Sequence, residues 1–433
     1  MEQVNNTNNT NKNMIDTNNI QKTRSAKAFK FNPLDKDFHA DPYLTYHRLR
    51  LEDPVHRNFA GEWVLTRYAD VKWVLKDSRF ATDRTPERIQ EKNIHVQRKG
   101  KDFNILTQTV RKWLLFVNPP DHTRLRGMVN KAFFLKTIER MHPQIQKIVE
   151  ELIGKVQNTG KMDIISDFAS PLPVIVMSKI LGLHTERHNQ LKYWADQLFL
   201  IFEPLMSLED YERLNQAAIE FTEYLREVIV ERLKQPQEDL LSTLIVTRTE
   251  QGQLTKQAED EILSFCTGLF SAGEETTVNL IGNGMLALLR HPNQMEKLKH
   301  NPGIIQSAIE ELLRFDSPVQ FIARIATEDV FIGNKMIRAG ERIIVSLGSA
   351  NRDPSQFPDP DLLELTRSDN NHLAFGDSIH ACLGSALARA QGQIAISTLA
   401  QQLFDLKLNT DKLEWQKNVI VRGLKALPVS FKH

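Results

Sequence analysis

The order of hydrophobic and polar residues divides the chain into a long helical part and a smaller β-rich part. A helix is predicted over residues 42–51, followed by a hairpin whose strands, 55–59 and 63–66, flank a turn at Ala60-Gly61. Residues 118–121 read N-P-P-D, a typical helix start, and helices are expected from there to about residue 315.

The longest helix is predicted between about residues 258 and 290, a stretch that contains no proline. At a rise of 1.5 Å per residue it would be roughly 50 Å long, enough to cross the whole molecule. Strands are predicted over residues 324–331 and 342–345, with a turn at Gly333-Asn334, and in a β-like tail at 419–431. Residues 84–112 are polar without clean periodicity and are expected to form a long loop.

Composition indicates a globular protein with a large core, because 41% of its 433 residues are apolar and 25% are charged. The 55 basic and 54 acidic residues balance to a net charge of +1, so no nucleic-acid partner is expected. The two cysteines rule out a fold built on disulfides and fit a reducing compartment.

Residues 1–26, rich in Asn, Thr and Lys, are expected to be a disordered tail, leaving one domain over 27–433. No apolar run approaches the roughly 20 residues that span a bilayer, so no membrane anchor and a cytoplasmic location are expected.

The residues most suggestive of chemistry surround one cysteine, where positions 375–384 read F-G-D-S-I-H-A-C-L-G. Cys382 lies in a glycine-flanked loop just before an amphipathic helix. Backbone N–H groups at a helix start stabilise an anion, so the loop is expected to lower the pKa of the thiol and favour the metal-binding thiolate. Cys266 lies in mid-helix without such a loop and is interpreted as a small core residue.

A second unusual stretch lies inside the predicted long helix, where residues 272–277 read A-G-E-E-T-T. Glycine and β-branched threonine both weaken a helix interior, and a threonine hydroxyl can bond back to the carbonyl four residues earlier and bend the helix. Local rules tend to be broken where function requires it.

Both stretches resemble motifs of the cytochrome P-450 family. The cysteine loop matches F-G-x-G-x-H-x-C-x-G except at Ser378, where the family usually has glycine, and residues 272–277 match A-G-x-(D/E)-T-T. The resemblance covers about residues 30–433 and is greatest to soluble bacterial members. It implies a single-domain, mainly α fold with a small β-region, in which haem lies between the long central helix and the cysteine-loop helix.

The resemblance also implies roles for individual residues. Cys382 would be the sole protein ligand to the iron of haem b, and Phe375 would contact the haem. Ala272 and Gly273 would line the oxygen groove. Glu275 and Thr276 would form the catalytic acid–alcohol pair that relays protons to bound dioxygen.

Two further sets of residues match the family by position. Residues 119–126 read P-P-D-H-T-R-L-R, similar to a helix of the bacterial members, and the positions that would hold the haem propionates are His122, Arg126, Arg324 and His380. Buried carboxylates need such partners. Glu311 and Arg314 match the family's structural E-x-x-R element, and either Arg352 or Arg367 would join them.

The implied reaction is insertion of one oxygen atom from O2 into a lipophilic small molecule, by hydroxylation or epoxidation, in secondary metabolism such as that of polyketides. Electrons would come from NAD(P)H through a separate reductase and a ferredoxin or flavodoxin, because the chain has no nucleotide-binding G-x-G-x-x-G of its own. A monomer is expected. Two alternatives remain: a haem-thiolate enzyme that uses peroxide or catalyses rearrangement or oxidative coupling, and a non-catalytic haem-binding sensor.

By family position, a largely apolar group of residues should line the substrate pocket. The group comprises the 84–112 loop, the 195–215 region with Trp194, Leu198, Phe199, Phe202 and Met206, then Leu269, Phe270, residues 319–322 and residues 419–421.

Overall fold

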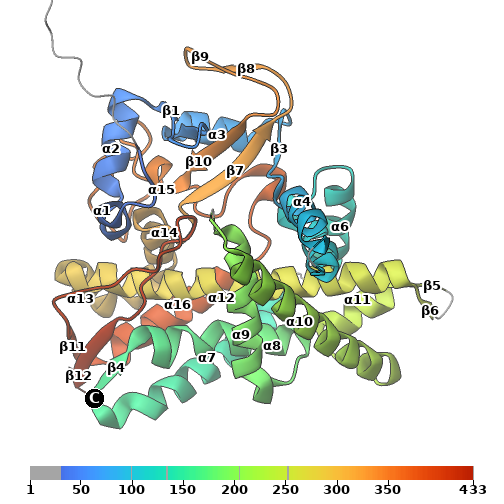
Figure 1. Cartoon of the computed structure of the whole chain (residues 1–433). Coiled ribbons are helices and arrows are strands. Elements are labelled where there is room, and N and C mark those ends of the chain that lie inside the picture. Colours follow the sequence, from blue (N-terminus) through green and yellow to red (C-terminus); the bar gives the residue numbers. More distant parts are fainter. Residues whose placement is uncertain (1–30, 99, 133–134, 204, 251–252, 433) are drawn as a thin grey trace, which may run out of the picture.

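The computed structural model describes residues 31–432 except 99, 133–134, 204 and 251–252 (Figure 1). The tail predicted over residues 1–26 lies outside the described residues. The helices are α1 (Lys36–Ala40), α2 (Tyr43–Glu52), α3 (Tyr68–Lys76), α4 (Thr85–Gln97), α5 (Asn104–Arg111), α6 (Asp121–Ala132), α7 (Leu135–Val156), α8 (Pro171–Leu181), α9 (His188–Phe199), α10 (Leu208–Lys234), α11 (Leu240–Arg248), α12 (Lys256–Arg290), α13 (Pro292–His300), α14 (Ile305–Phe315), α15 (Leu347–Ala350) and α16 (Ser385–Gln402). The strands are β1 (Val55–Arg57), β2 (Trp63–Leu65), β3 (Phe80–Thr82), β4 (Lys161–Asp163), β5 (Thr249–Glu250), β6 (Gln253–Leu254), β7 (Phe321–Ala326), β8 (Val330–Ile332), β9 (Lys335–Ile337), β10 (Arg342–Ser346), β11 (Phe404–Leu408) and β12 (Pro428–Lys432).

Helix α12 runs through the middle of the molecule, and its 35 residues confirm the predicted long helix (Figure 1). Thr255 caps its start by accepting a hydrogen bond from the Ala258 backbone N–H at 3.2 Å. The helix contacts α5, α8, α9, α14 and α16. Gly284 permits the close approach of α16, because a Cβ there would lie 2.9 Å from the Ile396 Cδ1 atom. Residues in the middle of α12 are therefore held between several helices.

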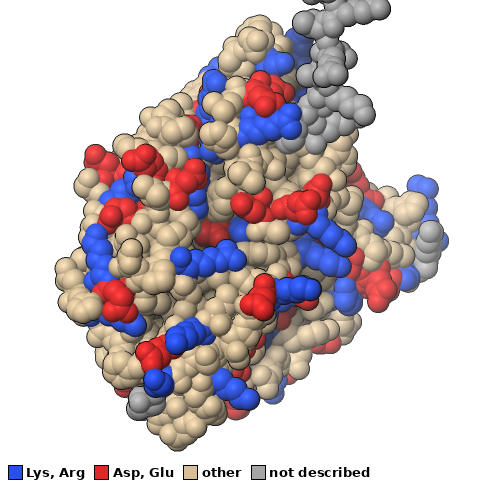
Figure 2. Space-filling model, turned by 90° about the vertical axis from the view of Figure 1, so that its left-hand side faces the viewer, with Lys and Arg blue, Asp and Glu red and all other residues tan. Residues whose placement is uncertain are grey.

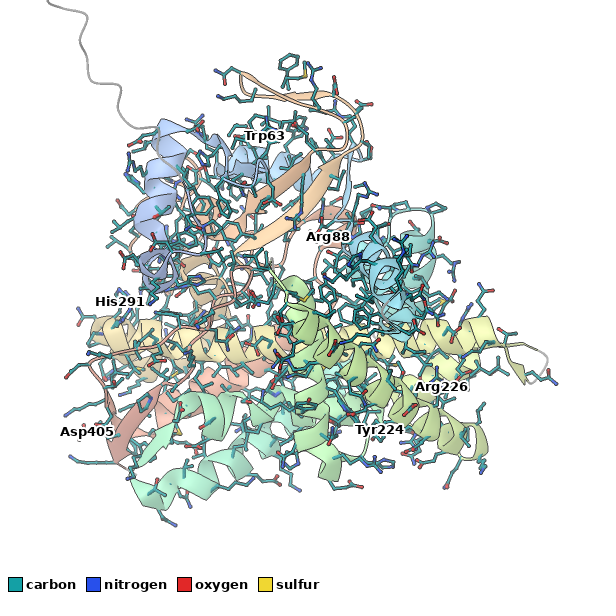
Figure 3. All side chains as sticks on the ribbon, viewed as in Figure 1. Trp63, Arg88, Tyr224, Arg226, His291 and Asp405 are labelled. Carbon is teal, nitrogen blue, oxygen red and sulfur yellow. The ribbon has the colours of Figure 1, made fainter. Side chains whose placement is uncertain are left out.

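The β-rich part lies on one side of α12 and is built on a five-stranded sheet with the order β1-β2-β10-β7-β3 (Figure 1). Strands β2 and β10 run parallel, with Ile343 opposite Trp63, and the other pairs in this sheet are antiparallel. Smaller sheets pair β11-β12-β4, β5-β6 and β8-β9. Side chains fill the space between the helices and this sheet (Figure 3), so the main α and minor β parts form the single-domain arrangement that the sequence predicts.

Several local predictions are confirmed. The hairpin forms as β1 and β2, the helix over 42–51 is α2, and α6 begins at Asp121 directly after the N-P-P segment. Gly333, with φ +57°, turns the chain between β8 and β9. The stretch predicted as one strand over 324–331 is instead divided between β7 and β8. In the C-terminal tail the strand is β12, paired with β11, which was not predicted.

The prediction of a long loop over residues 84–112 is wrong, because α4 and α5 lie there. The buried positions of α4 include Asn93 beside Ile89 and Val96, so its inner face is not uniformly apolar. The amide of Asn93 accepts a hydrogen bond from the Phe103 N–H at 2.7 Å and donates one to Asn104 Oδ1 at 2.8 Å. A helix held by a buried amide gives little hydrophobic periodicity, which is the signal on which the prediction depended.

One helical stretch among the described residues, Ile164–Leu181, is apolar and long enough to cross a membrane, and 72% of it is buried inside the protein. Burial within the core accounts for its composition. On the face shown in Figure 2, acidic and basic side chains are interspersed, without a concentrated basic surface.

Candidate active site

The cysteine loop is held in place by backbone hydrogen bonds. The Cys382 N–H donates to the Phe375 carbonyl at 2.8 Å, and the Gly376 N–H donates to the Leu373 carbonyl at 2.8 Å. Gly376 has a φ of +69°, in the left-handed region that glycine adopts without strain. Ser378, which replaces the second glycine of the motif, also has a positive φ of +63°. The serine therefore takes a backbone conformation that disfavours a side chain.

Cys382 faces an internal cavity, so its side chain is accessible from the cavity although protein surrounds it. Burial raises the pKa of the Cys382 thiol, whereas the Gly384 N–H and the nearby Arg126 and Arg389 act in the opposite direction. The expected lowering of this pKa is thus wrong for the protein alone, because desolvation outweighs the helix start. Cys266 is fully buried in the core and burial raises the pKa of its thiol further, as expected for a core residue.

The cavity has a volume of about 520 Å³ and connects the two motifs. Its lining includes Cys382 and Phe375 from the cysteine loop and Ala272, Gly273 and Thr276 from α12. Residues more than 100 positions apart in the sequence are thereby brought to one space, as the fold prediction requires.

Four basic side chains from three separate parts of the chain also line this cavity: His122, Arg126, Arg324 and His380. The rings of His122 and His380 lie with their centroids 4.2 Å apart. Arg126 donates hydrogen bonds to the carbonyls of Ile379 and Ala381, each at 2.7 Å, and so ties α6 to the cysteine loop.

The side chains of His122, Arg126, Arg324 and His380 form a basic cluster with few acidic neighbours. Burial, together with Arg324, His122 and Arg126, lowers the pKa of His380 to about 3. Burial lowers the pKa of Arg324 to about 10, and this side chain, 3% exposed, donates to the adjacent Ala323 carbonyl. Nε2 of His122 is buried without a hydrogen-bond partner in the described part of the chain. Such a cluster favours a ligand that carries carboxylates.

On α12, the Thr276 hydroxyl donates a hydrogen bond to the Ala272 carbonyl at 2.9 Å, and the Thr277 hydroxyl donates to the Gly273 carbonyl at 3.0 Å. These are the i−4 bonds that the sequence suggested. Glu275 is absent from the cavity lining. Its carboxylate accepts a hydrogen bond from Asn279 Nδ2 at 3.2 Å, and burial raises its pKa.

Glu274, adjacent to Glu275, belongs to a charged cluster between α12 and α9 that sequence reasoning missed. Its carboxylate is 1% exposed and lies 3.3 Å from Lys192 Nζ, which also contacts Asp196 at 2.9 Å. Oxygen atoms of Asp196, Glu274 and Glu275 lie within 4.8 Å of one another. Burial, and then repulsion by the neighbouring acids, raise the pKa of Glu274 to about 8 despite Lys192. Because Lys192 and Asp196 are partly exposed, this cluster joins the solvent to the buried side of α12.

The E-x-x-R element forms a buried ion pair. Glu311 and Arg314 are both fully buried, with Nε and Oε2 2.7 Å apart. Arg367 is the third member, since its Nε lies 3.1 Å from Glu311, whereas Arg352 instead pairs with Asp361. Arg314 also donates to the carbonyls of Asn351 and Pro360, so the element braces the chain that leads to the cysteine loop.

Comparison with known proteins assigns the family. The cytochrome P450 family profile matches residues 64–302 and 303–429. The chain is a cytochrome P450. It is 40% identical over 412 residues to the polyketide biosynthesis cytochrome P450 PksS of Bacillus subtilis, covering 92% of this chain and 98% of that one. It is 34% identical over 402 residues to 6-deoxyerythronolide B hydroxylase of Saccharopolyspora erythraea, covering 90% and 96%.

The structure is also similar to that of P450BioI in complex with an acyl carrier protein ligated by hexadec-9Z-enoic acid. The TM-score is 0.83 at 40% identity, and the match covers 92% of this chain and all of the other. The P450 is therefore a haem-thiolate monooxygenase of the soluble bacterial type, which uses haem b, O2 and reducing equivalents from NAD(P)H. The four basic side chains, which have few acidic neighbours, fit the two propionates of haem. The thiol of Cys382 in the same cavity fits the haem iron.

The lining of the cavity in this P450 agrees with the predicted pocket in part. Phe199, Phe202, Leu269 and the segments at 319–322 and 419–421 contribute to it. Trp194, Leu198 and Phe270 are instead buried in the core, and Met206 packs against the core without lining this cavity. Residues 113–116 line the cavity although they were not predicted to do so. These residues come directly after α5, in a part of the chain next to the predicted 84–112 loop.

Proposed function

We propose that this P450 inserts one oxygen atom from O2 into a lipophilic small molecule of the polyketide or acyl-chain class. Electrons would arrive one at a time from a separate ferredoxin or flavodoxin, and the enzyme would act as a cytoplasmic monomer. The name of the similar enzyme PksS supports the polyketide part of this class, and the complex of P450BioI with an acyl carrier protein ligated by hexadec-9Z-enoic acid supports the acyl-chain part. So does the apolar wall of the cavity, which includes Phe116, Phe199 and Leu269.

In this proposal Cys382 is the sole protein ligand to iron, and the four residues of the basic cluster bind the propionates. When bound, the haem supplies the activation of O2, which thiolate ligation promotes. Arg126 has a second task, because its hydrogen bonds to the Ile379 and Ala381 carbonyls fix the loop that carries Cys382. Phe375 packs against the guanidinium of Arg389, 4.4 Å from its ring centroid, and closes the loop on its other side.

Thr276 and Glu275 would deliver protons into the cavity. The hydroxyl proton of Thr276 is engaged by the Ala272 carbonyl, so its oxygen lone pairs are left to accept a hydrogen bond from a water in the cavity. Glu275 lies one residue earlier, rotated about 100° around the helix, beside the cluster of Glu274 and Lys192. The cluster would pass protons from solvent to Glu275, and ordered water would carry them on to Thr276.

The observation that carries the proposal is the meeting of Cys382, the basic cluster and Thr276 on one cavity. Its test is turnover of the holoenzyme with a surrogate plant-type ferredoxin and reductase under ¹⁸O2, with hexadec-9Z-enoic acid as the probe. We expect a product that carries one labelled oxygen atom and requires reductant. A product without label would favour rearrangement or coupling, and a product formed equally well from peroxide alone would favour the peroxide-using alternative.

A further inference from the structure

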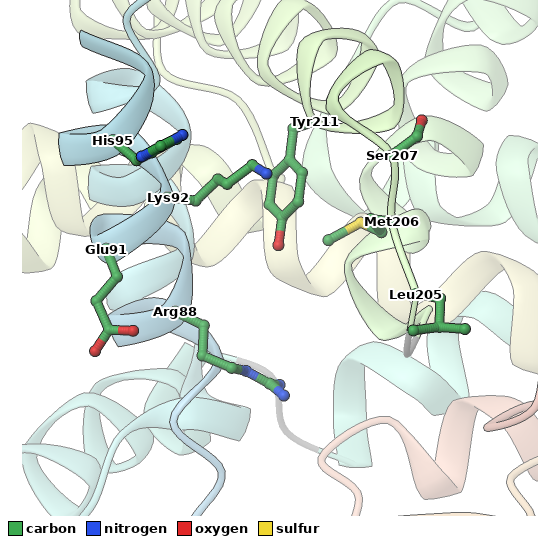
Figure 4. A pocket seen from close by; sticks show the side chains of 8 residues that line it. All are labelled: Arg88, Glu91, Lys92, His95, Leu205, Met206, Ser207 and Tyr211. Atoms are coloured by element: carbon green, nitrogen blue, oxygen red, sulfur yellow. The ribbon is translucent and has the colours of Figure 1, made fainter. Parts of the chain in front are cut away.

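A second pocket opens beside the haem cavity. It lies between α4 and the segment that leads into α10, has a volume of about 690 Å³, and is shown in Figure 4. The residues that line this mouth pocket are Arg88, Glu91, Lys92, His95, Leu205, Met206, Ser207 and Tyr211. Arg88 and Leu205 also line the haem cavity, so the two spaces adjoin. Arg88 lies on α4, between the five-stranded sheet and helices α9 and α10 (Figure 3).

Basic side chains dominate the α4 wall of the mouth pocket. Positions 88, 92 and 95 are spaced i, i+4 and i+7 and therefore share one face of the helix. Figure 4 shows these three side chains directed toward the segment from Leu205 to Tyr211, while Glu91, which also lines the pocket, extends away from that segment. The pocket thus presents three basic groups toward its interior.

Two of these groups have no acidic partner among the residues that the structure describes. Arg88 forms an ion pair with Asp83 at 2.8 Å. Lys92 lies over the ring of Tyr211, with Nζ 5.6 Å from the centroid, and neither Lys92 nor His95 pairs with an acid in the described part of the chain.

Glu203, two residues before Leu205, lines the haem cavity. Burial, with Asp210 nearby, raises its pKa to about 7, so it carries only part of its charge at neutral pH. Of the basic side chains that line the mouth pocket, Lys92 and His95 are therefore the two that face it without an acidic partner in the described part of the chain, and Glu91 is the acid in the lining.

The other wall is apolar where it meets the haem cavity. Leu205 is 74% exposed, and Met206 packs against the core beside it. A ligand that fits both walls has an anionic end and an apolar body.

We propose that the mouth pocket binds the anionic end of an elongated, otherwise apolar substrate whose chain passes Leu205 into the haem cavity. The anion is a carboxylate or a phosphate, bound by Lys92 and His95 with Arg88 at the boundary. This inference rests on the proposed oxidation of a lipophilic molecule and adds that the substrate is oxidised at a distance from its charged end.

The test compares ligand binding by the holoenzyme, followed through the haem absorbance. The probes are hexadec-9Z-enoic acid, its neutral methyl ester, and the same acyl chain as a phosphopantetheine thioester. The variant is Lys92→Gln/His95→Gln, and the control is Glu87→Gln, at an exposed position of α4 that lines neither pocket. We expect the double variant to weaken binding of the anionic probes about tenfold, as two exposed charge pairs each contribute a factor of a few. Binding of the methyl ester should not change, and the control should behave like the parent enzyme.

The two anionic probes separate the possible sources of the charge. A loss confined to the free acid assigns the pocket to a carboxylate, and a loss confined to the thioester assigns it to the phosphate of a carrier arm. An acid that binds the parent enzyme no more tightly than its ester, or a variant that binds every probe as the parent does, overturns the inference. Labelled oxygen in the product of the methyl ester would show in that case that the proposed function still holds.

Discussion

The hydroxyl of Thr276 has one acceptor inside its own helix, the Ala272 carbonyl, and one side open to the cavity. Its neighbours Glu274 and Glu275 face away from the cavity into a cluster with Lys192 and Asp196. The sequence predicted the threonine and the second acid, because they share a short motif. It did not reveal Lys192 and Asp196, whose i,i+4 spacing on α9 is typical of an ordinary surface ion pair.

Replacement of the Thr276 hydroxyl should uncouple the enzyme. Thr276→Ala is expected to retain haem and substrate binding but to divert reducing equivalents to hydrogen peroxide. Product per reductant should fall by about 10²-fold or more, as positioned proton transfer contributes this much. Thr276→Ser keeps the hydroxyl and should restore most of the coupling. Measured product, peroxide and reductant consumption decide this, and unchanged coupling in Thr276→Ala would remove Thr276 from the proton path.

Glu274 should make stability depend on pH. Its pKa of about 8 in the folded protein lies above the ordinary 4.5, so the folded state holds a proton that the unfolded state releases. The free energy of unfolding should therefore decrease as pH rises from about 5 to about 8. Glu274→Gln removes this contribution, so its urea midpoint should decline less over that interval than the midpoint of the parent. Equal slopes in the two proteins would contradict the buried, protonated state of Glu274.

At the scale of elements, the cysteine loop and α12 were predicted closely, because each contains a motif of residues that hydrophobic packing alone does not explain. Helix α4 was missed because Asn93 occupies a core position where an apolar residue would have given the helical period. Helix α5 was missed because Thr107 and Thr109 occupy two of its buried positions. The mouth pocket was missed with them, since its basic wall is visible only once residues 88–95 are helical. Long-range partners and helices held by buried amides are the features that a single sequence conceals.

The strained turn of the cysteine loop gives a prediction at the same scale. Ser378→Gly should raise the free energy of unfolding by about 1 kcal/mol, because relief of the left-handed conformation exceeds the entropy that glycine adds to the unfolded chain. Ser378→Ala retains the strained φ of +63° and should not stabilise the protein. Chemical denaturation of the holoenzyme measures both. A Ser378→Gly variant no more stable than Ser378→Ala would show that the serine is accommodated without strain.

At the scale of the whole molecule, the fold assembles one site from distant segments. Residues of α6, β7 and the cysteine loop form the basic cluster, and α12 supplies the remaining wall of the same cavity. The buried pair of Glu311 and Arg314, joined by Arg367, ties the chain before that loop to α14. The order of the motifs along the sequence indicated this assembly, but the choice between Arg352 and Arg367 needed the packed structure.

The central claim is that Cys382, and not Cys266, binds the haem iron. It is tested most directly by the absorbance of the reduced carbon-monoxide complex in Cys382→Ala and Cys266→Ala. Cys382→Ala should lose the red-shifted band that thiolate ligation produces, while Cys266→Ala, altered at a fully buried core position, should keep it. Retention of the band in Cys382→Ala, or its loss in a folded, haem-containing Cys266→Ala, would contradict the account.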